Sequence, residues 1–268
     1  MNKIKLQMIN YRKKNIQYSL FNIRYSIFIL IFFFLVQTSH AQQVFVTEGK
    51  IEFERKINLH KQLEDYGSWV ENFKDKIPQF KTDYFNLYFK DNKTLFEKGK
   101  DNEEKIPFFG DDKSLEDIIY TDLQHQTFVK KENVFGQALM LSDSIRKVEW
   151  RITNDTRDIA GFECRKAVGK ILDSVYIIAF YTDQIPVTSG PLSFCNLPGM
   201  VLGIAIPRIS VTYFATKLEL VEAPSSKLVP PPAKKLKTNN YKELEATLKN
   251  SMNDWGKEGR RYIINFLL

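Results

Sequence analysis

The chain has 268 residues and is poor in the side chains on which metalloproteins and many enzymes depend. It contains only two cysteines and three histidines. The sequence has no CxxC, HExxH, GxSxG, Walker or GxGxxG motif, and these motifs are typical of zinc sites, metalloproteases, α/β-hydrolases and nucleotide-binding folds. We therefore expect no metal-binding, cofactor-binding or catalytic residue in this chain, and no cofactor.

Scattered residues leave one enzymatic alternative open. A Ser-His-Asp or Cys-His site can combine residues far apart in the sequence, and His60 and His125 are the histidines that follow the N-terminal segment. Glycoside hydrolysis needs two carboxylates, and acidic residues lie close together in three places: Glu103 with Glu104, Asp111 with Asp112, and Asp155 with Asp158. These stretches are hydrophilic, so charge is expected there without catalysis, and we assign none of them a catalytic role.

The apolar run Ser26–Val36 is too short to span a membrane. Its 11 residues reach about 16 Å as a helix, against a hydrocarbon core of about 30 Å. Six basic and no acidic residues come before it, which is the layout of a secretory signal peptide. Ser39 and Ala41 place small residues around a cleavage site after Ala41. We expect contact with a membrane only through this leader, if it stays uncleaved.

The positive charge of the chain lies almost entirely in this leader. A net charge of +7 and a pI near 9.1 would ordinarily suggest nucleic acid or an anionic membrane as a partner. Without the six basic leader residues the chain keeps 33 basic and 32 acidic residues, a net charge of +1. We therefore expect no nucleic-acid partner, and we expect the protein in the periplasm or at the cell surface.

An oxidising compartment makes Cys164 and Cys195 candidates for a disulfide bond. The alternative is a pair of separate buried thiols that act as small hydrophobic side chains. We expect the disulfide, because these are the only two cysteines of a chain that is expected to reach an oxidising compartment.

Period-two alternation predicts strands over most of the chain. In the first strand, Ile51, Phe53 and Ile57 share one face, and Arg55 is the one charged exception on it. A second strand includes Phe85, and further β-rich runs are 118–130, 134–141, 147–153, 162–172, 174–182, 198–206 and 209–221. This pattern predicts a mainly β fold, either an antiparallel meander or a curved, half-barrel sheet.

Helical spacing predicts an inserted helix over 60–77 that ends before Pro78, and a C-terminal helix. The stripe of the C-terminal helix consists of Leu244, Leu248, Met252 and Trp255. Residues 225–237 contain three consecutive prolines and are expected to form an extended connector. The run Tyr176–Tyr181 is apolar on both faces, so we expect a central strand that is covered on both sides. The expected organisation is a signal peptide (1–41), a β-rich domain (42–222) and the connector with the C-terminal helix (223–268).

The chain resembles the GLPGLI family, a group of secreted proteins of Bacteroidota named for a six-residue motif. The resemblance rests on four segments in order: 150–153, 159–167, 179–186 and 190–202. The motif corresponds to Asn196, Leu197, Pro198, Gly199, Met200 and Val201. Leu197, Pro198 and Gly199 agree with the motif, whereas Asn196, Met200 and Val201 replace Gly, Leu and Ile. Pro198 and Gly199 also fit the central positions of a type II turn.

This resemblance implies an exported, mainly β protein without an established activity, similar to the non-catalytic N-terminal domain of a type II peptide-N-glycosidase. We expect a binding or accessory module for an apolar ligand or an envelope protein. The alternatives are an envelope hydrolase with carboxylates on loops and a structural protein of the envelope.

Overall fold

The computed structural model of the protein describes Met8, 11–13, 24–26, 45–64, 74–102, Ile106, 113–233 and 236–268. The chain divides into two compact units, Met1–Val44 and Phe45–Leu268, and every element named below belongs to the second. The predicted cleavage site after Ala41 lies outside the described residues. Within the described ranges, no helix is both long and apolar enough to cross a membrane.

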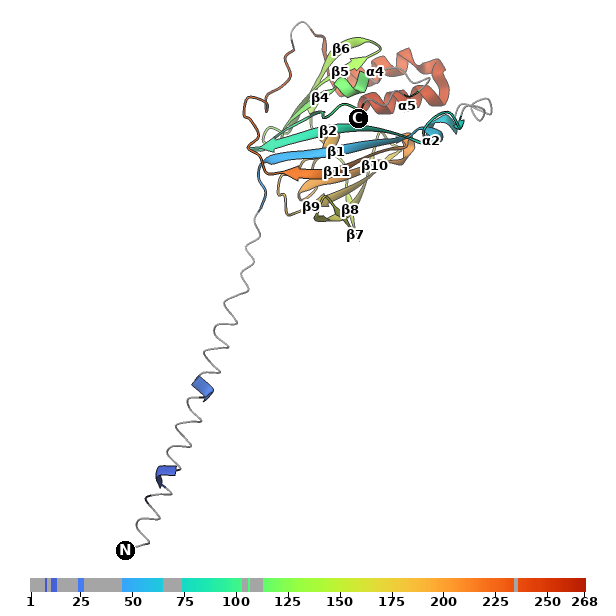
Figure 1. Ribbon diagram of the computed structural model, residues 1–268. Helices are drawn as coiled ribbons and strands as arrows, with labels where there is room; N and C mark the ends of the chain where they lie inside the picture. Colours follow the sequence, from blue (N-terminus) through green and yellow to red (C-terminus); the bar gives the residue numbers. More distant parts are fainter. Residues whose placement is uncertain are drawn as a thin grey trace. The chain divides into compact units, whose positions relative to one another are not determined.

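In the described residues, twelve strands form one curved sheet, as the alternation predicted (Figure 1). The strands are β1 (Gly49–Asn58), β2 (Phe80–Lys90), β3 (Lys93–Lys98), β4 (Ile118–Asp122), β5 (Thr127–Val134), β6 (Gln137–Ser144), β7 (Arg151–Ile159), β8 (Phe162–Ile171), β9 (Val175–Thr182), β10 (Met200–Ile206), β11 (Val211–Glu219) and β12 (Thr238–Asn239). Their order in the sheet is β12-β6-β5-β4-β3-β2-β1-β11-β10-β9-β8-β7. Neighbours are antiparallel, except that β12 runs parallel to β6. Among the described strands, β12 and β7 do not pair, so the sheet stays open.

Tight turns explain why consecutive strands pair in this sheet. Three hairpins have two-residue turns in which both residues have positive φ, as type I′ turns require. These turns are Asp91-Asn92, Phe135-Gly136 and Ala160-Gly161. The alternation of β1 sets its two faces: Ile51 and Phe53 are fully buried on the face that we call inner, whereas Lys50 and Glu52 lie on the outer face.

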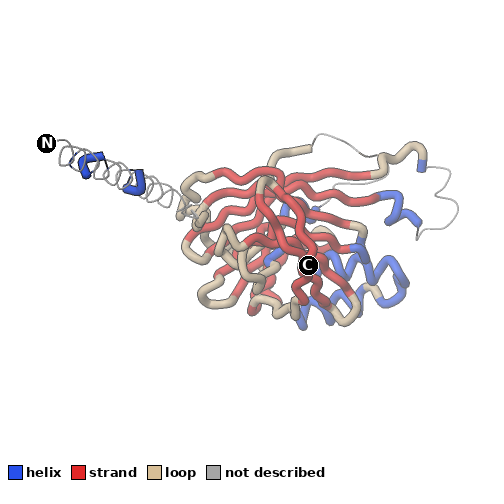
Figure 2. Tube along the Cα trace, turned by 90° about the horizontal axis from the view of Figure 1, so that it is seen from below, coloured by secondary structure: helices blue, strands red, loops and turns tan. Residues whose placement is uncertain are grey.

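The helices are α2 (Leu59–Leu63), α4 (Tyr241–Ser251) and α5 (Gly256–Leu267), with short 3-10 turns η3 (Lys113–Glu116), η4 (Pro191–Ser193), η5 (Pro207–Ile209) and η6 (Asn253–Trp255). Figure 2 shows that the longer helices gather at one end of the strands. A capping box starts α4, since Asn240 accepts from the Glu243 N–H at 2.9 Å and its own N–H donates to the Glu243 carboxylate. Leu244, Leu248 and Met252 are buried as predicted.

Several expected boundaries were wrong. Trp255 is 50% exposed, because it lies in η6, where the helical stripe is interrupted between α4 and α5. The run 118–130 is a hairpin with a turn at 123–126. Strand β3 was not predicted, because its short apolar segment is surrounded by charged residues. Of the helix expected over 60–77, α2 provides the start, and 65–73 lie outside the described residues.

The chain between β11 and β12 packs on the sheet and is more than a connector. Ala223 and Leu228 are buried against Leu95 and Tyr120 on the outer face of β3 and β4. The Lys227 ammonium pairs with Glu97. This segment covers part of the outer face of the sheet.

A loop between β9 and β10, residues 183–199, crosses the inner face of the sheet. Its turn η4 contacts β3 and β4 as well as β10. The Ser189 hydroxyl lies 3.2 Å from that of Thr94 on β3, and the Trp150 indole N–H donates to the Cys195 carbonyl oxygen at 3.0 Å. This β9–β10 loop therefore joins the two wings of the curved sheet from the inside.

Candidate functional site

The motif residues form the end of the β9–β10 loop, and two of them have unusual backbone conformations. Asn196 has a φ of 70°, and asparagine is the residue after glycine that best tolerates this left-handed region. Gly199 has a φ of 139°, and a Cβ there would collide with the Thr182 carbonyl oxygen. In place of the expected type II turn, the Gly199 N–H donates to the Leu197 carbonyl oxygen at 2.8 Å. The backbone conformation and the close approach of Thr182 therefore require glycine at position 199.

The motif side chains support the loop from within the core. Leu197, Met200 and Val201 are at most 2% exposed. Backbone hydrogen bonds fix the start of strand β10. The Met200 N–H donates to the Ile185 carbonyl oxygen at 2.9 Å, and the Val201 N–H donates to the Ser189 carbonyl oxygen at 2.8 Å. None of the six motif residues lines the pocket described below.

The two cysteines are free thiols in the described part of the chain, where a disulfide was expected. Each sulfur has its own surroundings: Cys164 on β8 donates to the Phe162 carbonyl oxygen at 3.5 Å, and Cys195 lies 4.0 Å from the Ser189 hydroxyl. Burial raises the pKa of each thiol to about 12. Both cysteines therefore behave as the small buried side chains of the alternative hypothesis.

Neither histidine joins a catalytic constellation. His60 Nε2 lies 2.9 Å from the Ile77 carbonyl oxygen, and His125 Nδ1 lies 2.8 Å from Asp122 on an exposed turn. In the segments that the structure describes, no three His, Cys, Asp or Glu side chains are placed to hold a metal ion. Of the acidic pairs, Glu103 with Glu104 and Asp111 with Asp112 lie outside those segments. Asp155 is paired with Lys166 at 2.9 Å, on edge strand β7.

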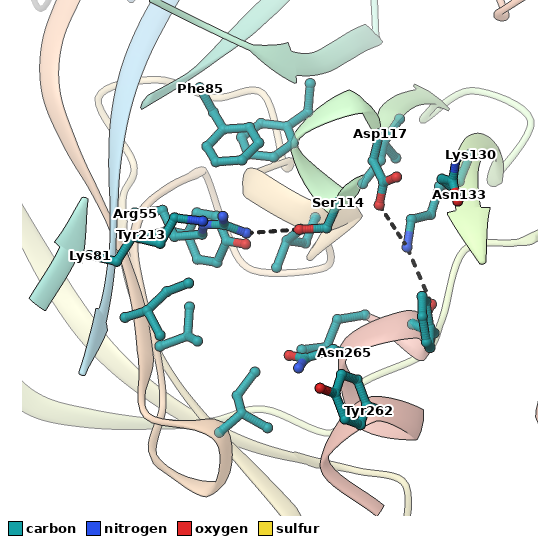
Figure 3. Close-up of a pocket in the computed structure, with 18 of the residues that line it drawn as sticks. Arg55, Lys81, Phe85, Ser114, Asp117, Lys130, Asn133, Tyr213, Tyr262 and Asn265 are labelled. Atoms are coloured by element: carbon teal, nitrogen blue, oxygen red, sulfur yellow. Dashed lines mark hydrogen bonds and ion pairs between the residues drawn. The ribbon is translucent and has the colours of Figure 1, made fainter. Parts of the chain in front are cut away.

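A cavity of about 470 Å³ lies on the inner face of the sheet (Figure 3). This is within the range of about 300–1,000 Å³ that is typical of small-molecule sites. Its apolar lining consists of Ile57, Leu59, Phe85, Phe96, Ile119, Phe135, Leu192, Ile209, Val211, Tyr213, Tyr262, Phe266 and Leu268. Its polar lining includes Arg55, Gln62, Lys81, Ser114, Asp117, Lys130, Asn133 and Asn265. We call this cavity the inner pocket.

Arg55 is a buried arginine in the wall of the inner pocket. It is 5% exposed, and the register of the sheet places it between Asp83 on β2 and Tyr213 on β11. Its Nη2 and Nε donate to the same Asp83 oxygen at 2.6 and 3.1 Å, and Nη1 donates to Ser114 at 3.1 Å. The guanidinium also lies 5.3 Å from the centre of the Phe85 ring. These contacts fix the orientation of the charge.

Lys130 is the second buried cation of the inner pocket, and it is 3% exposed. Its ammonium lies 2.8 Å from Glu132 and 3.6 Å from Asp117, and it donates to the Phe266 carbonyl oxygen at 3.2 Å. Burial lowers the pKa of Lys130, but the carboxylates of Glu132 and Asp117 outweigh this effect and raise it above its usual value. Lys130 therefore stays charged and ties β5 to α5.

Helix α5 closes one side of the inner pocket. Arg146 donates to the Leu267 carbonyl oxygen, which adds a second cation at the C-terminal end of the helix, where cations stabilise the helix dipole. Aromatic side chains surround this side, because the Phe135 ring lies 6.1 Å from Trp255 and 5.5 Å from Phe266. Phe135 and Trp255 are about half exposed.

This site was not predicted from the sequence, although two signals for it were present. Arg55 interrupts the apolar face of β1, and Lys130 and Glu132 share a face of β5 with buried Phe128. Charges inside an apolar alternation indicate either a buried ion pair or a site. The remaining wall residues come from loops and helices, whose positions depend on the fold.

Comparison with known proteins assigns the chain to a family. A family model described as the N-terminal domain of an N-glycanase matches residues 69–243. No curated protein matches the chain. Two crystal forms of PNGF-II share 16% identity with it at a TM-score of 0.48, over 74% and 78% of this chain but 32% and 33% of theirs. An uncharacterized conserved protein from Thermus thermophilus has 9% identity and a TM-score of 0.38, over 73% of this chain and 91% of that one. The chain thus spans about a third of the PNGF-II structures.

Proposed function

This chain belongs to the family of N-glycanase N-terminal domains, and on that premise we propose that it acts as a binding or accessory module and not as an enzyme. The inner pocket is where it holds a small, largely apolar ligand. One observation carries the proposal: a cavity of about 470 Å³ with a mainly apolar lining lies against the buried sheet core. A ligand in this cavity would bury apolar surface, and each Å² removed from water would stabilise the complex by about 25 cal/mol.

The chemistry of the inner pocket favours binding over the hydrolase alternative. Its buried cations are engaged in ion pairs, Arg55 with Asp83 and Lys130 with Glu132. Asp117 also lies 3.6 Å from the Lys130 ammonium. His60 and His125 lie away from the lining. A general acid and base at one reacting bond would need a different arrangement.

We also propose that the protein works outside the cytoplasm, in the periplasm or at the cell surface, and that it is related to the GLPGLI proteins. The basic, then apolar, N-terminal segment supports export. The glycine requirement at Gly199 and the left-handed Asn196 support the relationship, because both positions correspond to glycines of the family motif. The partner that the module serves is then a component of the envelope.

Binding of the neutral fluorophore Nile red tests the pocket proposal. We expect saturable binding to the full chain, and we expect it to be lost in Val211→Phe, because the larger side chain fills the inner pocket. Val221→Phe is the matched control, since Val221 follows the same strand and is 44% exposed. Melting curves identify variants that fail to fold. If Val211→Phe fails to fold, a rise in the melting temperature of the wild type on addition of Nile red tests binding in its place. Absence of saturable binding to the wild type would overturn the proposal.

A further inference from the structure

We propose that the ligand of the inner pocket is an anionic amphiphile, with a carboxylate or phosphate headgroup near Arg55 and Lys130 and an apolar chain along the aliphatic wall. This inference rests on the proposed function, because it concerns the same pocket. It adds the charge and the orientation of the ligand. It is carried by the way in which the buried ion pairs face the cavity.

Each of the two buried ion pairs presents its cation to the cavity. Arg55 and Lys130 line the inner pocket, whereas their partners Asp83 and Glu132 do not. Lys81 lines it as well and lies 3.8 Å from the same Asp83 carboxylate. The partner carboxylates are nearly fully buried behind their cations, at 5% and 2% exposure. Figure 3 shows Arg55 on one side of the cavity and Lys130 on the other.

This orientation favours an anion over a neutral or cationic group. An ion pair whose positive end is nearer to the cavity produces a positive potential there, and low polarity around it strengthens the effect. Asp117 is the one side-chain carboxylate in the described lining, and it lies 3.6 Å from Lys130. A guanidinium held in place by Asp83 and Ser114 is suited to charge-assisted hydrogen bonds with a carboxylate or phosphate oxygen.

The lining next to Arg55 suits an apolar chain. Ile57 is two residues beyond Arg55 on the inner face of β1 and pairs with Val211 on β11. With Ile209 and Leu192, these residues form the aliphatic wall of the inner pocket. Leu192 has a φ of 57°, a conformation that is costly for a bulky side chain and that recurs where a fold shapes a ligand site. An aliphatic part of the lining thus adjoins the cationic part along β1, so that one amphiphile can contact both.

Four probes with the same chain test the inference on the full protein: decanoate, decyl phosphate, decanol and decylammonium. We expect decanoate and decyl phosphate to displace Nile red at concentrations about 10-fold lower than decanol, since charge-assisted bonds are roughly twice as strong as neutral ones. Decylammonium is expected to bind most weakly. Equal or tighter binding of decanol or decylammonium would overturn the inference and leave the pocket proposal intact. Failure of all four probes and of Nile red would instead overturn the proposed function.

Acetate and inorganic phosphate separate a headgroup from a free anion. We expect both to bind at least 10-fold more weakly than decanoate and decyl phosphate, because they gain nothing from the aliphatic wall. If either binds as tightly as the corresponding amphiphile, the ligand is a free anion and the amphiphile assignment is wrong.

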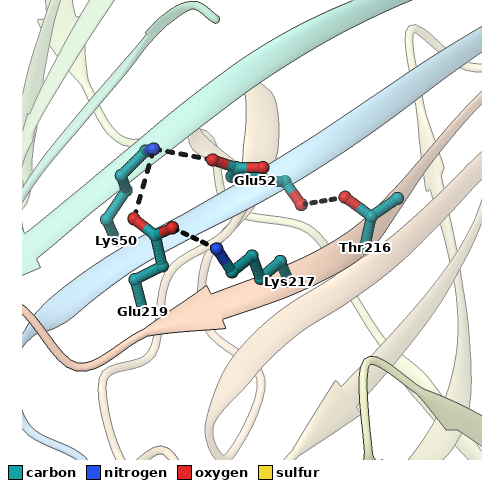
Figure 4. A network of polar contacts seen from close by, with 5 residues as sticks. All are labelled: Lys50, Glu52, Thr216, Lys217 and Glu219. Atoms are coloured by element: carbon teal, nitrogen blue, oxygen red, sulfur yellow. Dashed lines mark hydrogen bonds and ion pairs between the residues drawn. The ribbon is translucent and has the colours of Figure 1, made fainter.

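Two variants locate the headgroup. Lys81→Gln should weaken decanoate binding about 3- to 10-fold and leave decanol unchanged, whereas Lys217→Gln, an outer-face lysine that is also paired with a carboxylate, should change neither (Figure 4). The double variant Arg55→Met with Asp83→Leu removes both charges of the buried pair, so that neither is left without the other. It should bring the affinities for decanoate and decanol together. Retention of the full preference for decanoate in both variants would overturn the inference.

Discussion

The outer and inner faces of β1 carry the same kinds of charged residue in different surroundings. On the outer face, Lys50 lies 2.7 Å from Glu52 and 3.4 Å from Glu219, which also pairs with Lys217 (Figure 4). These side chains are 18–60% exposed, whereas those of Arg55 and Asp83 on the inner face are both 6% exposed.

Exposure decides what each set of charges does. Exposed pairs contribute little, because water solvates the separated charges almost as well. A buried pair has already lost its water, so removal of one partner strands the other, whereas the intact pair can serve a site. The outer network therefore contributes little to stability, whereas the inner pair is a buried part of the wall of the inner pocket.

The largest effect is expected from breaking the inner pair. Arg55→Met leaves Asp83 buried without its main partner, and we expect a loss of about 3–5 kcal/mol in the free energy of unfolding. Addition of Asp83→Leu should recover most of this loss, because both charges are then gone. Chemical denaturation of the two variants measures the difference. A single variant as stable as the double variant would show that the buried pair is not coupled as described.

The next effect concerns a buried group that titrates. The pKa of Cys195 is raised to about 12, so the folded state binds this proton more tightly than the unfolded state. Its contribution is fully present below the unfolded pKa near 8.5 and is lost as the pH rises toward 12, by about 2 kcal/mol at pH 10. Denaturation of the wild type and of Cys195→Ala between pH 8 and pH 10.5 should give a steeper decline for the wild type. Parallel curves would contradict the burial of the thiol.

The exposed outer network should respond oppositely and weakly to pH. Hydrogen bonding to Lys217, with the charge of Lys50, lowers the pKa of Glu219. Its contribution is present above the unfolded pKa near 4.3 and is lost as the pH falls. Because the group is solvated, Glu219→Gln should leave the acid limb of the stability curve nearly unchanged. A clear flattening of that limb would mean that this network contributes as much to the free energy of unfolding as the inner pair does.

A smaller effect is expected at Phe135, which lines the inner pocket. Phe135 occupies the first position of a type I′ turn with a φ of 52°, where asparagine is preferred. Phe135→Asn should change the free energy of unfolding by less than about 1 kcal/mol, since relief of the turn opposes the loss of ring contacts. Nile red binding should nevertheless weaken. Unchanged binding of Nile red would show that Phe135 does not contact the ligand.

The smallest effect is expected from Lys217→Gln. Loss of one exposed partner of Glu219 should shift the melting temperature by less than about 2 °C. A shift comparable to that of Arg55→Met would mean that exposure does not separate the two faces.

The sequence predicted the sheet well because alternation is a local property. It gave the inner positions of Ile51 and Phe53 and the buried stripe of α4, and it marked Arg55 as an exception. It did not give Asp83 as the partner, because this residue is 28 positions away and the pairing depends on the register of β1 with β2. Prediction of the inner pocket would also have required the position of the β9–β10 loop, which crosses the sheet, and of helix α5, which Lys130 holds.

The expected disulfide illustrates the same limit. Two cysteines and an expected export signal favour a bond on chemical grounds, but the bond also requires the two side chains to meet. In the fold, Cys164 lies in β8 and Cys195 in the β9–β10 loop, each with its own oxygen neighbour. Alkylation of the native protein should be slow at both thiols and should become complete after unfolding without a reductant.

A methyl NMR titration of the full chain with decanoate tests the central claim most directly. The account predicts saturable shifts at Ile57, Ile209 and Val211, which line the inner pocket, and no shifts at Leu220 and Val221, which are exposed elsewhere. Shifts confined to exposed methyl groups, or no saturable shift at Ile57, Ile209 and Val211, would contradict the account.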